Sequence, residues 1–234
     1  MTDTISFARV GLGGLEAELA NWGSSLSRIE LVRELEGGKQ ALVRVGAATT
    51  NLEMLNWSNQ SGWTLPMDII AVMITYGGSN AMICHGAGLH TQTLSDLVVE
   101  MDVVTADGSL VTVSDPTQLR SIAGCFGLAG IVTSITLRLD AMTYARFHPK
   151  KTRMAESIPR PGADPASQEF RKMVELCTQH YYTEFFWFPN RGEEEGYWEN
   201  CWNNDGVKED AIDINLAVDD EYQVNDNGIA NLIR

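Results

Sequence analysis

The strongest structural signal in the sequence is a β-hairpin at residues 97–114, LVVEMDVVTADGSLVTVS. Two runs rich in valine and leucine flank the pair Asp107-Gly108. An Asp-Gly pair between two such runs is typical of a tight hairpin turn, because glycine readily adopts the positive φ angle that the turn requires. A hairpin joins antiparallel strands, so any fold for this chain must contain an antiparallel pair.

Signals before the hairpin predict a strand and a helix. Alternating polarity predicts a strand at 41–46, ALVRVG, and Thr50 with Glu53 forms a capping box that predicts a helix over 51–62. The glycine at the end of this range predicts where the helix stops. The next run, DIIAVMITYGG at 68–78, is typical of a buried strand or a tight extended segment that closes on paired glycines.

Signals after the hairpin predict a second helix and a further strand. Asp115 followed by Pro116 is typical of a helix start, and GLAGIVTSITLRLD at 127–140 passes from glycine-rich chain into alternating polarity. The order up to residue 140 is strand, helix, strand, hairpin, helix, strand. We therefore expect an α+β fold, with one mixed or antiparallel sheet and helices packed on it.

The chain changes character after residue 143. The stretch 148–167 is rich in proline and charge and predicts a linker, while 167–180 has apolar residues at helical spacing. The run YYTEFFWFPN at 181–190 is typical of a strand ended by proline, and the acidic run from Glu193 is typical of a solvated loop. We expect a first domain at 1–143, and a linker with part of a second domain at 144–234.

Composition limits the possible partners and compartments. The net charge of −14 argues against nucleic acid and anionic membranes. The longest apolar run, at 69–74, is too short to span a bilayer, and the N-terminus does not resemble a secretory signal. The four cysteines are scattered without zinc-site spacing. These features predict a soluble protein with no structural zinc, and reduced thiols favour an intracellular compartment.

The segment with most chemical interest is the glycine-rich run GGSNAMICHGAG at 77–88. His85 and His90 lie five residues apart in a run not expected to be helical, which argues against a metal site. Cys84 and His85 are adjacent, so their side chains point apart, which argues against a thiol nucleophile with its base. Two interpretations stay open: a pair of tight turns, or a loop whose free N–H groups hold an anion. The run is neither a Walker A motif nor a Rossmann fingerprint.

Three segments, 43–66, 75–114 and 119–139, together resemble a known family. Their order is a GG…HGxG loop, LSD, a hairpin with ADG, a helix opening with DP, then GxxGIVT and TLRL. This order is similar to flavin-dependent oxidases of the vanillyl-alcohol-oxidase type, which have a PCMH-type FAD-binding domain. The similarity is strongest to sugar-1,4-lactone oxidases, acting on L-gulonolactone or D-arabinono-lactone, and to alditol oxidases.

The resemblance implies an FAD cofactor and a fold of two α+β subdomains followed by a cap domain. The 77–88 segment would contact the flavin and pyrophosphate, and Leu94, Ser95 and Asp96 would be structural, with Asp96 bracing the loop. Gly130 and Ile131 would contribute main-chain contacts at the adenine end. The implied cofactor-binding residues are Gly77, Gly78, Asn80, Cys84, His85, Gly86, Gly88, Gly130 and Ile131.

Two family motifs have no counterpart in this sequence. The pyrophosphate loop of the type GxGHS, whose histidine often links to the flavin, is missing, and GLGG at 11–14 lacks both histidine and serine. The His-Trp-x-Lys motif that supplies catalytic side chains is also missing. The resemblance therefore implies a chain truncated at both ends, comprising the second FAD subdomain and the start of a cap. It assigns no catalytic residue and no metal ligand, and His85 is not assigned as a covalent flavin site.

The sequence supports two main functional hypotheses. The first is an FAD-dependent oxidoreductase that transfers hydride from a CH–OH group of a sugar lactone or polyol to flavin N5. The second is a catalytically silent fragment that keeps the fold, binds flavin weakly or not at all, and self-associates or pairs with a complementing chain. A hydrolase using Cys84 or His85 is a third and weaker alternative. The aromatic residues Phe186, Trp187, Phe188, Trp198 and Trp202 are either a sugar site or the core of a sheet layer.

Overall fold

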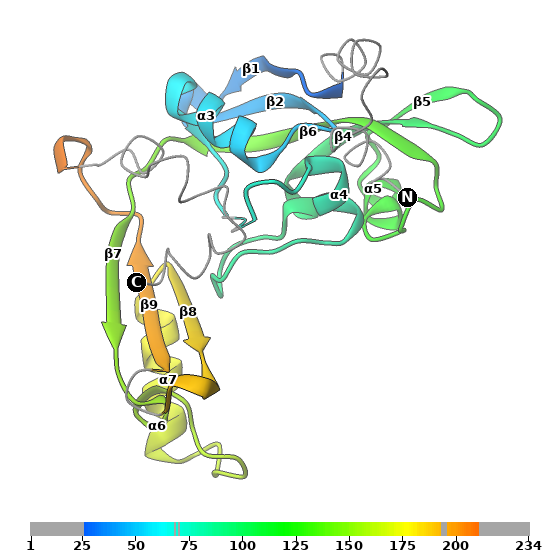
Figure 1. The fold of residues 1–234 in the computed structure, drawn as a ribbon. Coiled ribbons are helices and arrows are strands. Elements are labelled where there is room, and N and C mark those ends of the chain that lie inside the picture. The colour runs from blue at the N-terminus through cyan, green and yellow to red at the C-terminus, as the bar shows by residue number, and fades with distance from the viewer. Residues whose placement is uncertain (1–25, 68, 70, 193–195, 211–234) are drawn as a thin grey trace.

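The computed structural model describes residues 26–67, 69, 71–192 and 196–210, and its main element is a six-stranded sheet (Figure 1). The strand order is β1-β2-β6-β4-β5, with β3 also paired to β6. Every pairing is antiparallel, which confirms the expected α+β fold with an antiparallel sheet. The strands are β1 (Ile29–Leu35), β2 (Gln40–Gly46), β3 (Trp63–Thr64), β4 (Val98–Val104), β5 (Leu110–Val113) and β6 (Ile131–Ala141).

Helices cover one face of this sheet. The helical elements are η1 (Glu36–Gly38), α3 (Asn51–Ser61), α4 (Tyr76–Ala81), η2 (Leu94–Leu97) and α5 (Pro116–Ile122). Alternate residues of β2 and β6, such as Val43 and Leu137, are fully buried and form one core with Met54 of α3, Tyr76 of α4 and Leu119 of α5. This period of two fixes which face of each strand carries the core.

The predicted caps and turn are confirmed. The Thr50 hydroxyl accepts from the Glu53 N–H at 3.2 Å, and the Glu53 carboxylate accepts from the Thr50 N–H at 2.8 Å. The Asp115 carboxylate accepts from two N–H groups in the first turn of α5. Gly108, in the turn between β4 and β5, has φ +84°, as the hairpin requires.

The other face of the sheet is polar and centres on Asp102, which is only 7% exposed. Its carboxylate accepts from the hydroxyls of Thr112 at 2.7 Å and Ser134 at 3.0 Å. It also forms an ion pair with Arg44 of β2. Asp102 thus joins β4 to its neighbour β5, to β6 and to β2 across the sheet.

A second, three-stranded antiparallel sheet follows β6, and Figure 1 shows it projecting away from the first. Its order is β7-β9-β8. Its elements are β7 (Arg146–Lys151), α6 (Met154–Ser157), α7 (Gln168–Gln179), β8 (Tyr182–Trp187), η3 (Pro189–Arg191), β9 (Tyr197–Asn203) and η4 (Lys208–Asp210). The change of sheet between Ala141 and Arg146 coincides with the expected domain boundary, while the division into 1–143 and 144–234 stays a prediction.

Two sequence-based expectations for the second half are wrong. The stretch 148–167 is not simply a linker, because it contains most of β7 and all of α6. Pro149 is tolerated in β7 because that strand is at the edge of its sheet. The acidic stretch after residue 191 contains β9, which is the central strand. Residues 193–195 and 211–226 of that stretch lie outside the described residues.

The expectation for 68–78 is also corrected. No strand is present in its described part, and the segment instead ends inside α4. The N–H groups of Asn51 and Leu52 donate to the carbonyls of Ile74 and Val72, both at 2.9 Å or less. The segment therefore lies alongside the start of α3 rather than within a sheet, and this tertiary pairing is not visible in the local pattern.

The small sheet buries an acidic side chain against α6. Glu199 of β9 is 6% exposed, and its carboxylate accepts a hydrogen bond from Ser157 of α6. Burial raises the pKa of the Glu199 carboxyl, the nearby Lys150 lowers it, and Glu156 raises it further. The folded protein therefore holds a proton on Glu199 more tightly than the unfolded chain does.

We expect Glu199→Gln to stabilise the small sheet at neutral pH by about 1 kcal/mol, because burying a charged carboxylate costs more than burying a hydrogen-bonded amide. Since the folded pKa is raised, wild-type stability should fall as the pH rises above the unfolded value of about 4.3 and passes through the folded pKa. The variant should lack this fall. Urea unfolding at several pH values measures this pH dependence of stability, and Glu175→Gln, at an exposed position, is the control. An unchanged pH profile in Glu199→Gln would contradict the expectation.

Candidate functional site

The first half of the glycine-rich run lies in the buried helix α4, and the expectation that this run is not helical is wrong for residues 77–81. At position 77 there is no room for a side chain. An added Cβ would lie 2.9 Å from both the Cβ and the carbonyl oxygen of Ala47, and the Gly77 N–H donates to that oxygen at 2.9 Å. Glycine at position 77 therefore allows α4 to pack directly on the chain that follows β2.

The second half of the run is a partly exposed loop fixed at both ends. The Cys84 N–H donates to the Ser79 carbonyl at 2.9 Å, and the Cys84 carbonyl accepts from the Leu94 N–H at 3.0 Å. Ile83, before this point, has φ +53°, which is strained for a β-branched residue. The loop is thus held in shape by its ends rather than by its glycines.

Between these ends, main-chain N–H groups have no acceptor among the described residues. Within the described part of the chain, the N–H groups of residues 85–88 donate no hydrogen bond, and His85 is exposed. The His85 Nδ1 lies 2.9 Å from the Gly86 carbonyl oxygen, so the ring is turned back on its own loop. Consecutive free N–H groups in an exposed loop are the chemistry that binds an anionic group such as a phosphate.

Gly88 lies where the loop meets the small sheet. An added Cβ would be 2.6 Å from the ring of Tyr182 and 2.8 Å from the Thr91 hydroxyl. Tyr182 is 1% exposed and belongs to the same core as the larger sheet. The close contact between the loop and β8 therefore requires a residue without a side chain at position 88.

A second turn, at 123–130, comes beside α4. The Asn80 carbonyl accepts from the N–H of Gly124 at 3.3 Å and from the Ser95 hydroxyl at 3.4 Å. Gly130 follows, with φ +128° and its Cα against the end of β4, and Ile131 is 55% exposed. The structure thus connects the turn before Gly130 to α4, and it places Gly130 at the entry to β6.

The three residues expected to be structural have that role. The Asp96 carboxylate accepts from the Thr93 N–H at 3.0 Å and from the Thr93 hydroxyl at 2.8 Å, which caps η2. Leu94 is fully buried, and Ser95 bonds the Asn80 carbonyl. These contacts brace the loop from its C-terminal side.

A polar pocket of about 450 Å³ adjoins the end of this loop, where the two sheets meet. Arg138 and Asp140 of β6 reach it, and most of the other lining groups are also polar. Arg138 donates to the Gln92 amide oxygen at 3.2 Å, and Gln40 donates to the Asp140 carboxylate at 2.8 Å. The lining residues are Gln40, Pro66, His90, Thr91, Gln92, Leu97, Arg138, Asp140 and Tyr181. The sequence analysis predicted none of these residues as part of a pocket and considered His90 only as a metal ligand, because the lining residues are far apart in the chain.

Residues 22–114 match the family of FAD-binding domains. The chain is 34% identical over 100 residues to an alditol oxidase from Streptomyces sp. (strain IKD472 / FERM P-14339), covering 42% of this chain and 24% of that protein. It is 24% identical over 112 residues to an L-gulono-1,4-lactone dehydrogenase from Mycobacterium tuberculosis, covering 48% of this chain and 23% of that one. These matches identify an FAD-binding domain within this chain, similar to part of each of these two relatives.

Solved structures agree on the fold. Cholesterol oxidase from Brevibacterium sterolicum superposes with a TM-score of 0.61 at 21% identity, over 76% of this chain and 34% of that one. A solvent-stable cholesterol oxidase gives a TM-score of 0.62 at 19% identity, over 78% and 35%. The chain spans about a quarter of the length of the curated relatives and about a third of these structures. The cofactor of the family is FAD.

The residues present fit this cofactor. The free N–H groups of 85–88 suit its negatively charged pyrophosphate. In α4, the Ser79 hydroxyl and the Asn80 side-chain oxygen are buried and have no hydrogen-bond partner in the described structure. Leaving buried polar groups without a hydrogen-bond partner costs free energy, and a bound cofactor would supply such a partner. The assignment of the nine individual contact residues stays a prediction.

Two further observations concern partners. Among the described residues, no group of three histidine, cysteine or acidic side chains is placed to hold a metal ion. No helix in the described ranges is long and apolar enough to cross a bilayer.

Proposed function

We propose that this chain forms part of an FAD-dependent oxidoreductase that oxidises a CH–OH group of a sugar lactone or polyol. The observation that carries the proposal is the continuity between the free N–H groups of 85–88 and the polar pocket reached by 90–92. An anion-binding loop that runs into a polar pocket positions a nucleotide cofactor beside a small polar substrate. Two relatives are named for an alditol and a sugar lactone, which supports the same substrate class.

The pocket has the mixture of groups that a polyhydroxylated molecule needs. Each hydroxyl both donates and accepts, so a site that binds several must offer both kinds of partner. Arg138 is a donor, Asp140 is an acceptor, and Gln40 and Gln92 are both. The Arg138–Gln92 and Gln40–Asp140 hydrogen bonds hold these four side chains in place before a ligand arrives.

The reaction requires one proton acceptor from the protein. Bound FAD supplies the acceptor for the hydride that leaves the CH–OH carbon, and the hydroxyl proton must go to a base. His90 is the lining side chain with a ring nitrogen suited to this role, whereas Asp140 already accepts from Gln40. We infer that His90 takes the hydroxyl proton while Arg138 and Gln92 orient the other hydroxyls.

Titration of the purified chain with FAD tests the first part of the proposal. Binding should quench the flavin fluorescence with a saturating, single-site curve, and a polyol should then bleach the visible flavin absorption band as the flavin is reduced. Binding without reduction would leave a flavoprotein that is silent towards polyols. Absence of binding would favour the alternative, in which the chain keeps the fold without using the cofactor.

A charge placed at the loop tests the role of its N–H groups. In His85→Glu a carboxylate lies beside the free N–H groups, and we expect it to repel the FAD pyrophosphate. Two like charges about 6 Å apart at an intermediate dielectric repel by roughly 1.4 kcal/mol, which is about a tenfold weaker Kd. His85→Gln is the matched neutral control, since position 85 is exposed. Equal Kd values for the two variants at low salt would remove the loop from the cofactor site.

A further inference from the structure

A second pocket, of about 260 Å³, lies between α3 and the small sheet and differs in character from the polar one. Phe147, Trp202 and Tyr182 occupy opposite positions on β7, β9 and β8, so their side chains share one sheet face. The Phe147 and Trp202 rings stack with centroids 5.1 Å apart, and Tyr182 meets Trp202 edge-on at 4.5 Å. These three rings form one wall, which we call the aromatic wall.

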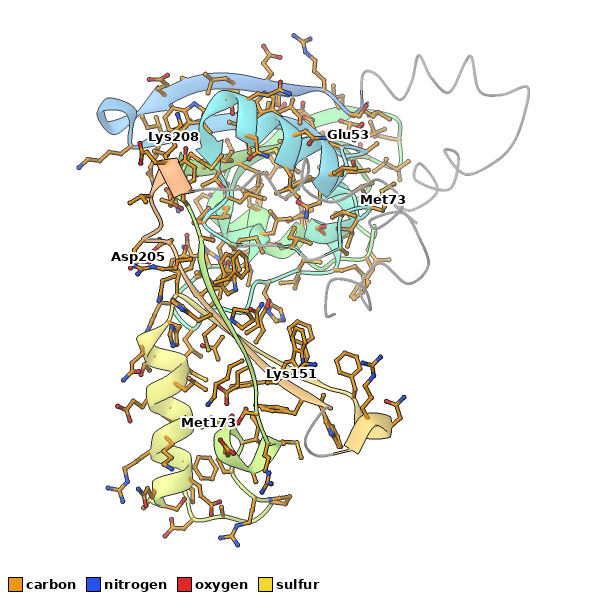
Figure 2. The ribbon with its side chains drawn as sticks, turned by 60° about the vertical axis from the view of Figure 1, so that its left-hand side comes forward. Glu53, Met73, Lys151, Met173, Asp205 and Lys208 are labelled. Carbon is orange, nitrogen blue, oxygen red and sulfur yellow. The ribbon has the colours of Figure 1, made fainter. Side chains whose placement is uncertain are left out.

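Aliphatic side chains from the larger sheet's helical layer line the opposite side. Met54 of α3 and the segment with Leu65 and Met67 contribute apolar side chains, and Asn51, Ser58 and Thr64 contribute polar ones. An apolar cavity of about 150 Å³ is enough to hold benzene, so 260 Å³ accommodates an aromatic ring with its linker. Figure 2 shows the small sheet with α7 along one side, where Met173 is labelled. The aromatic wall is on the face whose side chains meet the larger sheet.

The two pockets adjoin each other. Pro66, Asp140 and Tyr181 line both of them. The Tyr181 hydroxyl donates to the Pro66 carbonyl at 2.6 Å, so this contact marks the boundary between the polar pocket and the aromatic one. A single molecule that occupied both would need a hydroxylated end and an end that packs on aromatic rings, joined by a short link.

We propose that the aromatic pocket binds an aryl group attached to the polyol, so that the preferred substrate is an aryl-substituted polyol or sugar rather than a free one. This inference rests on the proposed function for the polar end. The aryl ring packs against the aromatic wall, where edge-to-face and stacked contacts add to burial of its surface. Its hydroxylated part stays with Arg138, Gln92 and Asp140.

Calorimetric titration of the FAD-loaded chain with three probes tests the proposal. The probes are xylitol for the polar pocket, benzyl alcohol for the aromatic pocket, and 1-O-benzyl-xylitol for both. We expect the benzyl ether to bind at least about 30-fold more tightly than xylitol, which corresponds to about 2 kcal/mol. Equal affinities for xylitol and its benzyl ether, or no binding of any probe, would overturn the proposal.

A variant at the rim connects the effect to this pocket. Thr143 is exposed and lines the aromatic pocket, so Thr143→Trp should fill it without disturbing the core. We expect this variant to lose the 30-fold gain while xylitol binds as before. Thr178→Trp, at an exposed position of α7, is the control and should keep the gain. A gain that survives Thr143→Trp would also overturn the proposal.

The outcomes separate this inference from the proposed function. Turnover of xylitol without a gain from the benzyl group would leave the proposed function standing and remove the aromatic pocket. Binding of the benzyl probes that Thr143→Trp abolishes, without turnover of any polyol, would keep the aromatic pocket and remove the polyol oxidation.

Discussion

Gly130→Ala is expected to lower the free energy of unfolding by about 3 kcal/mol or more. Gly130 has φ +128°, a conformation that a residue with a Cβ rarely adopts. An added Cβ would also lie 2.9 Å from the Val103 side chain and closer still to the carbonyl oxygen of Val104. Strain and overpacking each cost roughly 1–3 kcal/mol, and here both act at once. Urea unfolding of the FAD-free protein measures the loss.

Gly108→Ala separates the two causes. Gly108 also has a positive φ, +84°, but an added Cβ would meet nothing within 4 Å. We expect this control to cost about 1 kcal/mol, since only backbone strain is involved. Similar losses in the two variants would show that the contact with β4 does not matter. Because Gly130 is also a predicted cofactor contact, unfolding without FAD is needed to distinguish a damaged fold from a lost ligand contact.

Asp102→Ala is expected to destabilise the larger sheet by about 3 kcal/mol. The change leaves the Thr112 and Ser134 hydroxyls without their acceptor and removes the ion-pair partner of Arg44. Removing one member of a buried, hydrogen-bonded charge pair costs about 3–5 kcal/mol, and the lower end applies because the Arg44 side chain is 42% exposed.

Glu100→Ala is the matched control for Asp102→Ala. Glu100 lies on the same strand, 3.9 Å from the same arginine, but its side chain is 38% exposed. An exposed pair of this kind contributes between 0 and about 1 kcal/mol. Thermal unfolding of both variants should therefore show a much larger drop in Tm for Asp102→Ala. A drop of equal size would mean that the hydroxyl network around Asp102 adds nothing.

Features that depend on neighbouring residues were predictable from the sequence. The capping box of Thr50 and Glu53 and the cap at Asp115 involve groups within three residues of each other, and the structure has both. The hairpin turn at Gly108 is equally local. The family resemblance, which rests on motifs in a fixed order, also predicted the fold class and FAD.

Features set by distant contacts were not predictable in the same way. The pattern around Gly77 shows that glycine is present, but only the structure shows that Ala47 is the neighbour that requires it. Helix α4 is set by contacts with the start of α3, whereas the local pattern of its segment predicts extended chain. Strand β9 was read as part of an acidic loop because Glu199 lies in its core-facing series with Tyr197 and Cys201, where charge is unexpected.

The polar pocket likewise could not be predicted from local sequence patterns. Gln40, His90 and Arg138 come from separate parts of the chain, and no local pattern brings them together. Their proximity follows from the pairing of β2 with β6 and from the position of the loop before η2. The sequence predicted a cofactor loop at 77–88, whereas the pocket that we propose for the substrate could be recognised only from the fold.

The contact between Gly88 and Tyr182 connects the two ends of the site thermodynamically. Tyr182 forms part of the aromatic wall, and Gly88 is in the loop with the free N–H groups. We therefore expect a ligand that shifts one of these residues to change the free energy of binding at the other, and such coupling is reciprocal. Cofactor and aryl substrate should then each alter the affinity of the chain for the other by the same factor.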